Sequence, residues 1–500
     1  MKILLVTGRL AEQRVKKIAE KFNCGVVVAQ VETASCLTPE LIIQSVKGFS
    51  DFDVLLVPGL LKKDLNIIEK STGIKTFRGP KDVADLEYVL ESIKSIEFSK
   101  EIPADELIKE KLKTRALERL KTVNSSAYIK KMLKKPGNVM VGSLPVGIDF
   151  PIRVLAEIVD AGNLSKKELL HQAKYLKNSG ADIIDLGFNE KNPAAVKSAV
   201  RLLKKNINLP VSVDTMEKEN IRAAFGNADM ILSFDRELLH EFSNVTTPSV
   251  IIPRRRDIHS PGERIKILEK NIELARKRGF KRIIADLILQ PVNFGFVDSI
   301  MAYRKFSEKH SYPILMGAGN ITELFDADSV GINALLCAIA SECSASIVFT
   351  TEASDKTRGS VRELATASKM MHLGRLRNSL PKDLGIDLLL LKEKRIIRER
   401  LDRERLNREC LQGKVKAKAA KKHPLDEKGY FKIFVGEKIE CVHYFRGKRD
   451  VCIEGKNARE ICDTVYAMRL ISNHSHALYL GRELQKAEFA LKFGKSYVQS

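Results

Sequence analysis

The chain has 500 residues, of which 44% are hydrophobic and 30% are charged, and its formal net charge is +22 at pH 7. This mixture excludes a disordered or fibrous protein and indicates about three folded domains at roughly 150 residues each. No apolar run approaches the roughly 20 residues that cross a bilayer, and the first residues read as a strand and not as a cleaved leader. Eight cysteines without a Cys-x-x-Cys pair agree with reduced thiols. We therefore expect a cytoplasmic protein with no membrane partner.

Residues 1–100 alternate short apolar runs with helical stretches. This alternation predicts a small open α/β domain with a parallel sheet. Glycines follow three of the apolar runs and basic residues lie near them, but the spacing of a phosphate-binding loop is absent, so ordinary turns explain them better than an anion site. The glycines are Gly8, Gly59 and Gly79, and the basic residues are Arg9, Lys62, Arg78 and Lys81.

A basic, helix-prone connector covers residues 101–137 and ends at Pro136-Gly137. Between residues 138 and 376 the pattern becomes regular, because eight strand candidates are each followed by a helical segment. This repetition predicts a (β/α)₈ TIM barrel, with a doubly wound sheet of similar content as the alternative. The strand candidates are 139–146, 183–187, 210–214, 230–234, 249–253, 282–286, 313–317 and 346–350.

Chemistry in such a barrel belongs to the carboxyl ends of the strands. Three acids, Asp185, Asp214 and Asp286, each close an apolar strand, so we expect their carboxylates at the rim of the barrel core. An ionised acid there is costly unless a donor meets it, and these strands supply no obvious basic partner. The full set of polar residues expected at the strand ends is Asp149, Asp185, Asn189, Asp214, Ser233, Asp235, Arg254, Arg255, Arg256, Asp286, Gln290, Asn320 and Glu352.

Convergent carboxylates over an apolar floor suit either a metal ion or a flat heterocycle with several N–H donors. A catalytic metal would require His beside the acids, or for Mg²⁺ a phosphate-holding loop, and neither accompanies these strand ends. We therefore expect no metal ligands among them. The 2-amino-pyrimidinone edge of a pterin, by contrast, presents two adjacent donors to one carboxylate.

The segments 180–187, 210–215, 226–233 and 284–286 resemble, in order and spacing, the pterin-binding barrel of dihydropteroate synthase, which the methyltetrahydrofolate:corrinoid methyltransferases share. The resemblance implies that Asp286 accepts from the 2-amino and N3 positions of the pterin. It also implies that Asp214 bonds the pyrazine side of the ring and that Asp185 approaches the reacting end. Ser233 lies where the family usually has Asn, which implies a weaker or water-mediated contact.

The residues after the seventh and eighth expected strands bear on which reaction is plausible. Dihydropteroate synthases carry Ser-Arg-Lys and Arg-x-His there, whereas this chain has Gly317-Ala-Gly-Asn320 and Phe349-Thr-Thr-Glu352. Asn320 is similar to the methyltransferase Asn that bonds the reduced pterin where the methyl group departs. The run Arg254-Arg255-Arg256 after the fifth strand could instead hold a phosphate or pyrophosphate, although such runs are as often solvated. A pyrophosphate substrate would add Mg²⁺ as a cofactor.

A basic linker covers residues 377–423, and its segment 392–422 contains 13 Lys or Arg and 5 Asp or Glu. The alternating charges favour a solvated helix over a polyanion-binding arm. Residues 424–500 read as three short strands and two helices, which predicts a small α+β domain. The Cys and His residues in this domain match no zinc-module spacing, so a metal site is not favoured.

The whole arrangement resembles the archaeal dihydropteroate-synthase-related proteins, which implies a reduced pterin of folate or methanopterin type. The leading hypothesis is a transferase that condenses this pterin with an arylamine. The alternative is methyl transfer from a reduced pterin carrier to a corrinoid protein or similar acceptor. A hypothesis of another class is a non-catalytic regulator that binds pterin or nucleic acid, although the scarcity of aromatic residues disfavours nucleic acid. An oligomer is compatible with all three.

The assigned residues are Asp185 and Asn320 as catalytic, and Asp214, Ser233, Asp286, Arg254, Arg255 and Arg256 as substrate-binding.

Overall fold

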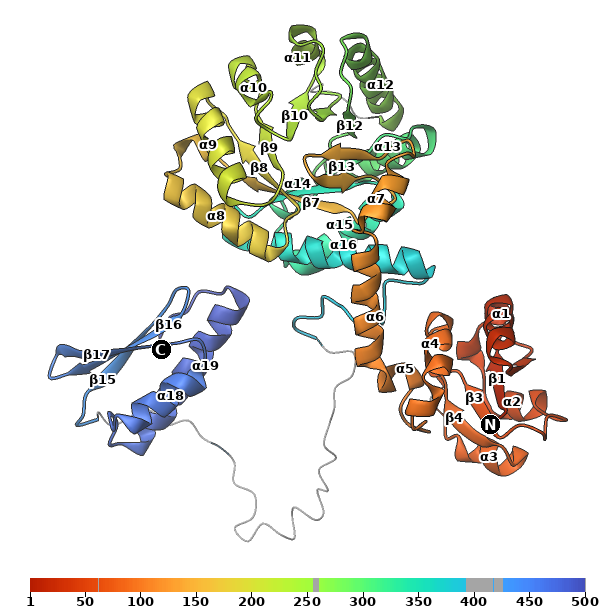
Figure 1. Ribbon diagram of the computed structural model, residues 1–500. Helices are drawn as coiled ribbons and strands as arrows, with labels where there is room; N and C mark the ends of the chain where they lie inside the picture. The colour runs from red at the N-terminus through yellow and green to blue at the C-terminus, as the bar shows by residue number, and fades with distance from the viewer. Residues whose placement is uncertain (62, 255–259, 393–416, 418–425, 500) are drawn as a thin grey trace. The chain divides into compact units, whose positions relative to one another are not determined.

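The computed structural model describes residues 1–61, 63–254, 260–392, 417 and 426–499, which belong to two compact units, residues 1–390 and 391–500 (Figure 1). Most of the basic segment expected at 392–422, together with Arg255 and Arg256, lies outside the described residues. None of the described helices combines the length and the apolar character needed to span a membrane.

The first unit begins with an open, four-stranded parallel sheet in the order β2-β1-β3-β4. Helices cover both faces, which explains why the strands are almost wholly apolar. Helices α1 and α4 pack on one face, and α2 and α3 on the other. The elements are β1 (Ile3–Thr7), α1 (Glu12–Phe22), β2 (Gly25–Val28), α2 (Pro39–Ser45), β3 (Val54–Val57), α3 (Asn66–Thr72), β4 (Lys75–Arg78) and α4 (Leu86–Glu91).

Three helices, α5 (Ala104–Leu107), α6 (Lys109–Thr122) and α7 (Ser126–Met132), connect this sheet to a closed barrel of eight parallel strands. The barrel closes where β14 pairs with β7, from Ile347 opposite Arg153 to Thr351 opposite Glu157. This closure confirms the predicted (β/α)₈ barrel and excludes the doubly wound sheet. The strands are β7 (Arg153–Ile158), β8 (Ile183–Gly187), β9 (Val211–Asp214), β10 (Met230–Phe234), β11 (Ser249–Ile251), β12 (Ile283–Asp286), β13 (Ile314–Gly317) and β14 (Ile347–Thr351).

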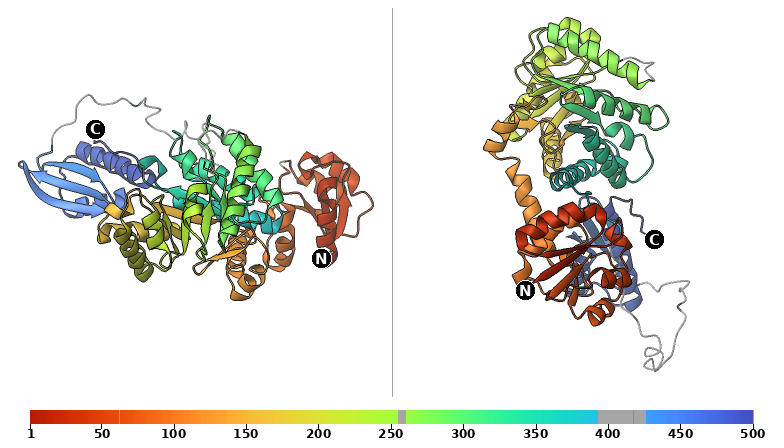
Figure 2. Two further views of the ribbon diagram at one scale, coloured as in Figure 1. Left: turned by 90° about the horizontal axis from the view of Figure 1, so that it is seen from above. Right: turned by 90° about the vertical axis from the view of Figure 1, so that its right-hand side faces the viewer.

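Helices follow the barrel strands along the chain and surround them (Figure 2). Apolar residues on the inner faces of the strands fill the barrel interior, among them Leu155, Ile183, Ile284 and Ile347. The helices are α8 (Lys166–Ser179), α9 (Pro193–Asn206), α10 (Lys218–Ala224), α11 (Arg236–Glu241), α12 (Pro261–Lys277), α13 (Phe296–Lys309), α14 (Gly319–Thr322), α15 (Ser329–Glu342) and α16 (Ser360–Arg377).

The segment 139–146, expected to be the first barrel strand, is instead a hairpin of β5 (Val139–Val141) and β6 (Leu144–Val146). Gly142 adopts φ +55° and turns the chain in the middle of the apolar run. Val141 and Val146 pack with the residues of the barrel interior. Arg153 Nε, at the start of β7, donates a hydrogen bond of 3.0 Å to the Pro145 carbonyl, so the hairpin covers the amino-terminal end of the barrel. The first barrel strand is β7, which the expected set lacked.

The second unit is a three-stranded antiparallel sheet with two helices, as the sequence predicts for a small α+β domain. Apolar residues of α18 and α19 share one core with the sheet. The elements are β15 (Tyr430–Val435), β16 (Ile439–Phe445), β17 (Lys448–Gly455), α18 (Ala458–Ala467) and α19 (His474–Phe493).

Replacing Leu155 by Ala tests the packing inside the barrel. Leu155 is 0% exposed, so we expect the substitution to lower the free energy of unfolding of the first unit by about 2–5 kcal/mol. Chemical denaturation measures this loss. Leu380, which is 71% exposed, provides a matched control whose change to Ala leaves stability nearly unaltered. Equal effects of the two substitutions would contradict the barrel interior described above.

Candidate functional site

A cavity of about 230 Å³ opens at the carboxyl ends of the first four barrel strands. Its polar lining includes Glu157 from β7, Asp214 from β9 and Ser233 from β10. Asp160 and Asn189 lie in the loops after β7 and β8 and also line the cavity, where Asn189 Nδ2 donates to Asp160 Oδ1 at 2.6 Å. The cavity is therefore at the barrel end where catalytic groups gather in this fold.

Asp185 lies deeper in the barrel than the sequence suggests. Strand β8 continues past Asp185 to Gly187, and the register places Asp185 beside Ser212 and Gly187 beside Asp214. The expectation that all three acids close their strands is therefore wrong for Asp185. Its side chain is fully buried, and its Oδ1 accepts a hydrogen bond of 2.5 Å from the Ser212 hydroxyl. Its Oδ2 has no hydrogen-bond partner within the described part of the chain.

Glu157 is a further acid of this site that was not predicted from the sequence. Its residue pairs with Asp185 across β7 and β8, and its carboxyl lines the cavity beside Asp214. A Cβ atom on Gly187 would lie 2.8 Å from Glu157 Oε1, so the glycine leaves the carboxyl its space. The sequence does carry a signal for Glu157, since it is the one acid within the apolar run 153–158. The first strand was expected at 139–146, so this run was not read as a strand.

Burial and mutual repulsion raise the pKa values of these acids. Burial, followed by the charge of Asp214, raises the pKa of Glu157 to about 7. Burial, and then Asp214 and Glu157, raise the pKa of Asp185 well above its ordinary value. Burial also raises the pKa of Asp214, an effect that the Ser233 hydroxyl opposes. At neutral pH Glu157, whose pKa is about 7, carries its proton in part of the molecules and can exchange it with a ligand.

Asp286 ends β12 and is held by two hydrogen bonds on a single oxygen. The Tyr303 hydroxyl donates to Asp286 Oδ1 at 2.5 Å, and the Ile288 N–H donates to the same atom at 2.7 Å. The hydrogen bonds that the described residues give to this carboxylate thus end on Oδ1, and Oδ2 keeps its capacity to accept from a ligand. Burial raises the pKa of Asp286 to about 6, although the Tyr303 and Ile288 donors oppose that rise.

The loop after Asp286 is held in a strained conformation. Ile288 has φ +62°, which a β-branched residue rarely adopts. The buried guanidinium of Arg264 donates to the carbonyls of Leu287 at 3.0 Å and Ile288 at 3.2 Å. Arg264 also lowers the pKa of Asp286, so this strand end has a basic neighbour that the sequence did not reveal. Backbone strain of this kind persists where the surroundings impose it, often at functional sites.

Two other residues assigned from the sequence support neighbouring loops. Asn320 Nδ2 donates to the Leu289 carbonyl at 2.8 Å, which ties α14 to the loop after β12. Arg254 Nη1 lies 3.4 Å from Asp235 Oδ2, and Asp235 Oδ1 accepts from the Leu238 N–H at the start of α11. The structure therefore pairs Arg254 with an acid.

Two polar residues expected at the strand ends have structural contacts instead. Asp149 precedes β7 and accepts hydrogen bonds from Lys135 and Asn138, so it does not belong to the barrel mouth. Glu352 accepts from the Tyr175 hydroxyl and from the backbone N–H groups of Gly359 and Val361, which fixes the start of α16.

The mouth offers carboxyl acceptors rather than a metal-binding geometry. Among the residues that the structure describes, no group of three or more His, Cys, Asp or Glu side chains is arranged to hold a metal ion. Glu157 can exchange a proton near neutral pH, and burial favours the protonated forms of Asp185 and Asp214. Asp286 can accept hydrogen bonds from a donor-rich ligand.

The fold and the site define a class of protein: a (β/α)₈ barrel with a carboxyl-lined mouth, preceded by an open α/β domain and followed by an α+β domain. The chain is 39% identical over 527 aligned residues to the uncharacterized protein MJ0107 of Methanocaldococcus jannaschii, and the match covers 100% of this chain and 98% of that protein. The chain therefore belongs to the same family as MJ0107. Residues 1–81 match a family of unknown function, DUF6513, and residues 425–500 match the family PterinBD-DUF4346.

Solved structures show more distant similarity. Dihydropteroate synthase from Xanthomonas albilineans, in complex with 7,8-dihydropteroate, is 19% identical, with 47% of this chain and 96% of that chain covered and a TM-score of 0.38. Dihydropteroate synthase from Thermus thermophilus is 18% identical, with coverages of 46% and 97% and a TM-score of 0.36. A truncated 3-deoxy-D-arabino-heptulosonate 7-phosphate synthase from Thermotoga maritima is 13% identical, with coverages of 52% and 97% and a TM-score of 0.35.

The raised pKa of Glu157 predicts a pH-dependent stability. The folded state holds this proton more tightly than the unfolded state, so the contribution of Glu157 to stability is present below pH 4.5 and is lost as the pH rises through about 7. We expect Glu157→Gln to reduce the decline in stability between pH 5 and 8, by at most about 3 kcal/mol. Thermal unfolding across this range measures the effect. Glu308→Gln on the exposed side of α13 is the control, and the same pH slope in wild type and Glu157→Gln would refute the assignment.

Proposed function

We propose that the chain binds a reduced pterin at the mouth of the barrel and acts on it as a transferase. The observation that carries this proposal is Asp286, a partly buried carboxylate whose two hydrogen bonds from the described residues fall on Oδ1. A pterin presents its 2-amino and N3 donors side by side, and such an edge would satisfy Oδ2 while keeping the acid ionised. Each charged hydrogen bond of this kind contributes about 1.5–3 kcal/mol.

The neighbouring acids would contact the rest of the ring. Asp214 and Ser233 both line the cavity and are assigned to the pyrazine side. Glu157 lines the same cavity, and Asp185 lies beneath it in the barrel interior, so these two groups are assigned to proton exchange near the reacting end. The match of residues 425–500 to a family whose name refers to pterin binding agrees with this ligand class.

Replacing Asp286 by Asn tests the ligand. We expect the affinity for 6-hydroxymethyl-7,8-dihydropterin, measured by calorimetric titration, to fall at least about tenfold because a neutral amide cannot replace the charged acceptor. The carboxylate accepts only when ionised, so the wild-type affinity should rise roughly tenfold between pH 5 and 7, as expected for a group whose pKa is about 6. Asp286→Asn should abolish this rise.

Asp229→Asn serves as the matched control for that titration. Asp229 precedes β10 and accepts from the Val211 N–H and from Lys204, at the opposite end of the barrel from the cavity. The control should keep the wild-type affinity and pH dependence. No binding of the pterin by the wild-type protein, or equal losses in the two variants, would refute the proposed site.

The proposed reaction follows from the charge of the cavity. Condensation with an arylamine expels pyrophosphate, which the acids of the cavity would repel, and Arg254 already pairs with Asp235. In methyl transfer the N5–CH₃ bond breaks, the methyl group passes to a nucleophilic acceptor, and the electron pair left on N5 takes up a proton. Glu157, whose pKa is about 7, can hold that proton at neutral pH. The geometry therefore favours methyl transfer to a corrinoid or similar acceptor, and the sequence resemblance retains condensation as the second candidate.

An activity assay of the purified protein with each pair of substrates distinguishes the two reactions. We expect the protein to demethylate a methylated tetrahydropterin carrier in the presence of reduced cobalamin. The absorption spectrum of the methylcobalamin that forms monitors the reaction. Glu157→Gln should lower the turnover number more than the KM, since it removes a proton donor and retains the size of the side chain. Formation of a pteroate from hydroxymethyldihydropterin pyrophosphate and 4-aminobenzoate, without methyl transfer, would instead establish condensation.

A further inference from the structure

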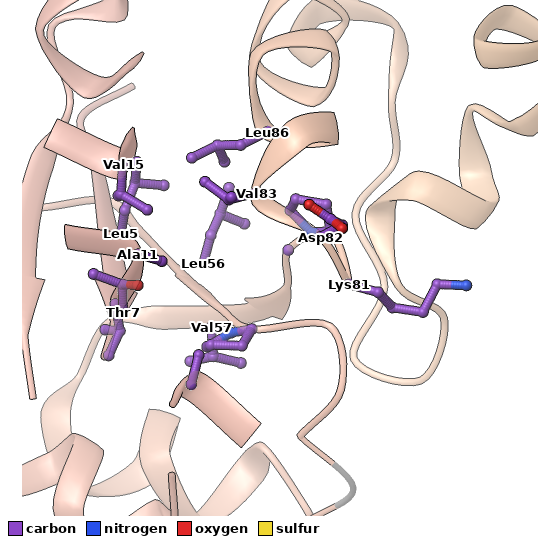
Figure 3. A pocket seen from close by; sticks show the side chains of 15 residues that line it. Leu5, Thr7, Ala11, Val15, Leu56, Val57, Lys81, Asp82, Val83 and Leu86 are labelled. Atoms are coloured by element: carbon purple, nitrogen blue, oxygen red, sulfur yellow. The ribbon is translucent and has the colours of Figure 1, made fainter. Parts of the chain in front are cut away.

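The sheet of the first domain contains a second place where a ligand can bind. Its strand order, β2-β1-β3-β4, reverses between β1 and β3. In open α/β sheets ligands bind in the crevice outside the carboxyl ends of the strands at such a reversal. A cavity of about 230 Å³ lies at this position, between the end of β1, the end of β3 and the loop after β4 (Figure 3).

The deep part of this cavity is apolar. Val15 from α1, Leu56 from β3 and Leu86 from α4 line it, and these residues belong to one buried cluster (Figure 3). Pockets for drug-sized ligands usually have volumes of about 300–1,000 Å³, so this cavity suits a single ring system better than a dinucleotide.

The charges around the cavity do not favour a phosphate. Lys81 points away from the cavity in Figure 3, and its Nζ lies 3.1 Å from Asp105, 3.2 Å from Glu106 and 3.5 Å from Asp383. Gly59 serves the packing of the loops, because a Cβ atom there would lie 2.6 Å from the Gly79 carbonyl oxygen. Lys81 is thus paired with acids, and Gly59 is required by the close approach of two loops.

The polar groups at the rim of the cavity are an acid and a hydroxyl rather than free cations. Asp82 lines the cavity, and its Oδ1 accepts from the Ala84 N–H at 2.8 Å. No other hydrogen bond to this carboxylate comes from the residues that the structure describes, so Oδ2 can accept from a ligand. The Thr7 hydroxyl, at the end of β1, is a second polar group in the lining (Figure 3).

We infer that this cleft of the first domain binds an aminated aromatic heterocycle of purine size, with the ring against Val15, Leu56 and Leu86 and the amino group donating to Asp82. Adenine offers such an exocyclic amino donor on a flat ring. The inference does not depend on the pterin proposed for the barrel, because it rests on different residues.

Ligand-observed NMR and titration of the full chain with adenosine, 2-aminopyrimidine and inorganic pyrophosphate test this inference. We expect the two ring compounds to bind and pyrophosphate not to bind. Asp82→Asn keeps a side chain that can cap the following turn but loses the charge, so it should weaken binding at least about tenfold. Ala11→Phe, which fills the cavity from the start of α1, should abolish binding.

Two controls locate the effect. Asp64→Asn changes another turn-forming acid of the same domain, one that accepts from the Asn66 N–H at 2.9 Å, and it should bind like the wild type. Asp286→Asn should also leave adenosine binding unaltered, which separates this cleft from the barrel mouth. Absence of binding by both ring compounds, tighter binding of pyrophosphate, or binding unaffected by both Asp82→Asn and Ala11→Phe would each overturn the inference.

Discussion

Repulsion among closely spaced carboxyl groups, one buried and two partly buried, is the constraint on which the barrel mouth depends. Glu157, Asp185 and Asp214 occupy three adjacent strands, and burial disfavours a negative charge on each of them. Protons therefore remain in the cluster near neutral pH, and its local charge is lower than the number of acids suggests. A ligand that brings N–H donors relieves this repulsion, whereas an anionic ligand increases it.

At Asp286, hydrogen bonds partly offset the effect of burial on the carboxyl group. Tyr303 and a backbone N–H hold one of its oxygens, and the pKa of this carboxyl stays close to 6. Arg264 fixes the loop carbonyls around it and so maintains the positive φ of Ile288. The site thus combines a proton-holding cluster on one side with a firmly positioned acceptor on the other; under the proposed function, this arrangement would orient the pterin ring before it reacts.

The sequence predicted much of this arrangement but not its depth. Apolar runs that end in an acid identified Asp214 and Asp286, because strand periodicity is a local signal. The depth of Asp185 in the barrel depends on the register between β8 and β9. The hairpin at 139–146 depends on packing against the barrel interior. Neither the register nor the packing is a local property of the sequence. Tyr303 and Arg264 reach Asp286 from helices, so only their proximity in space reveals them. Glu157 could have been found from its apolar neighbours once β7 was recognised.

The β5–β6 hairpin has a consequence for the side from which the barrel site can be reached. Val141 and Val146 pack with the apolar residues that fill the barrel interior, at the end opposite the cavity. That end is therefore closed by packed side chains, and solvent or a ligand reaches Glu157 and Asp214 from the side of the loops that follow the strands.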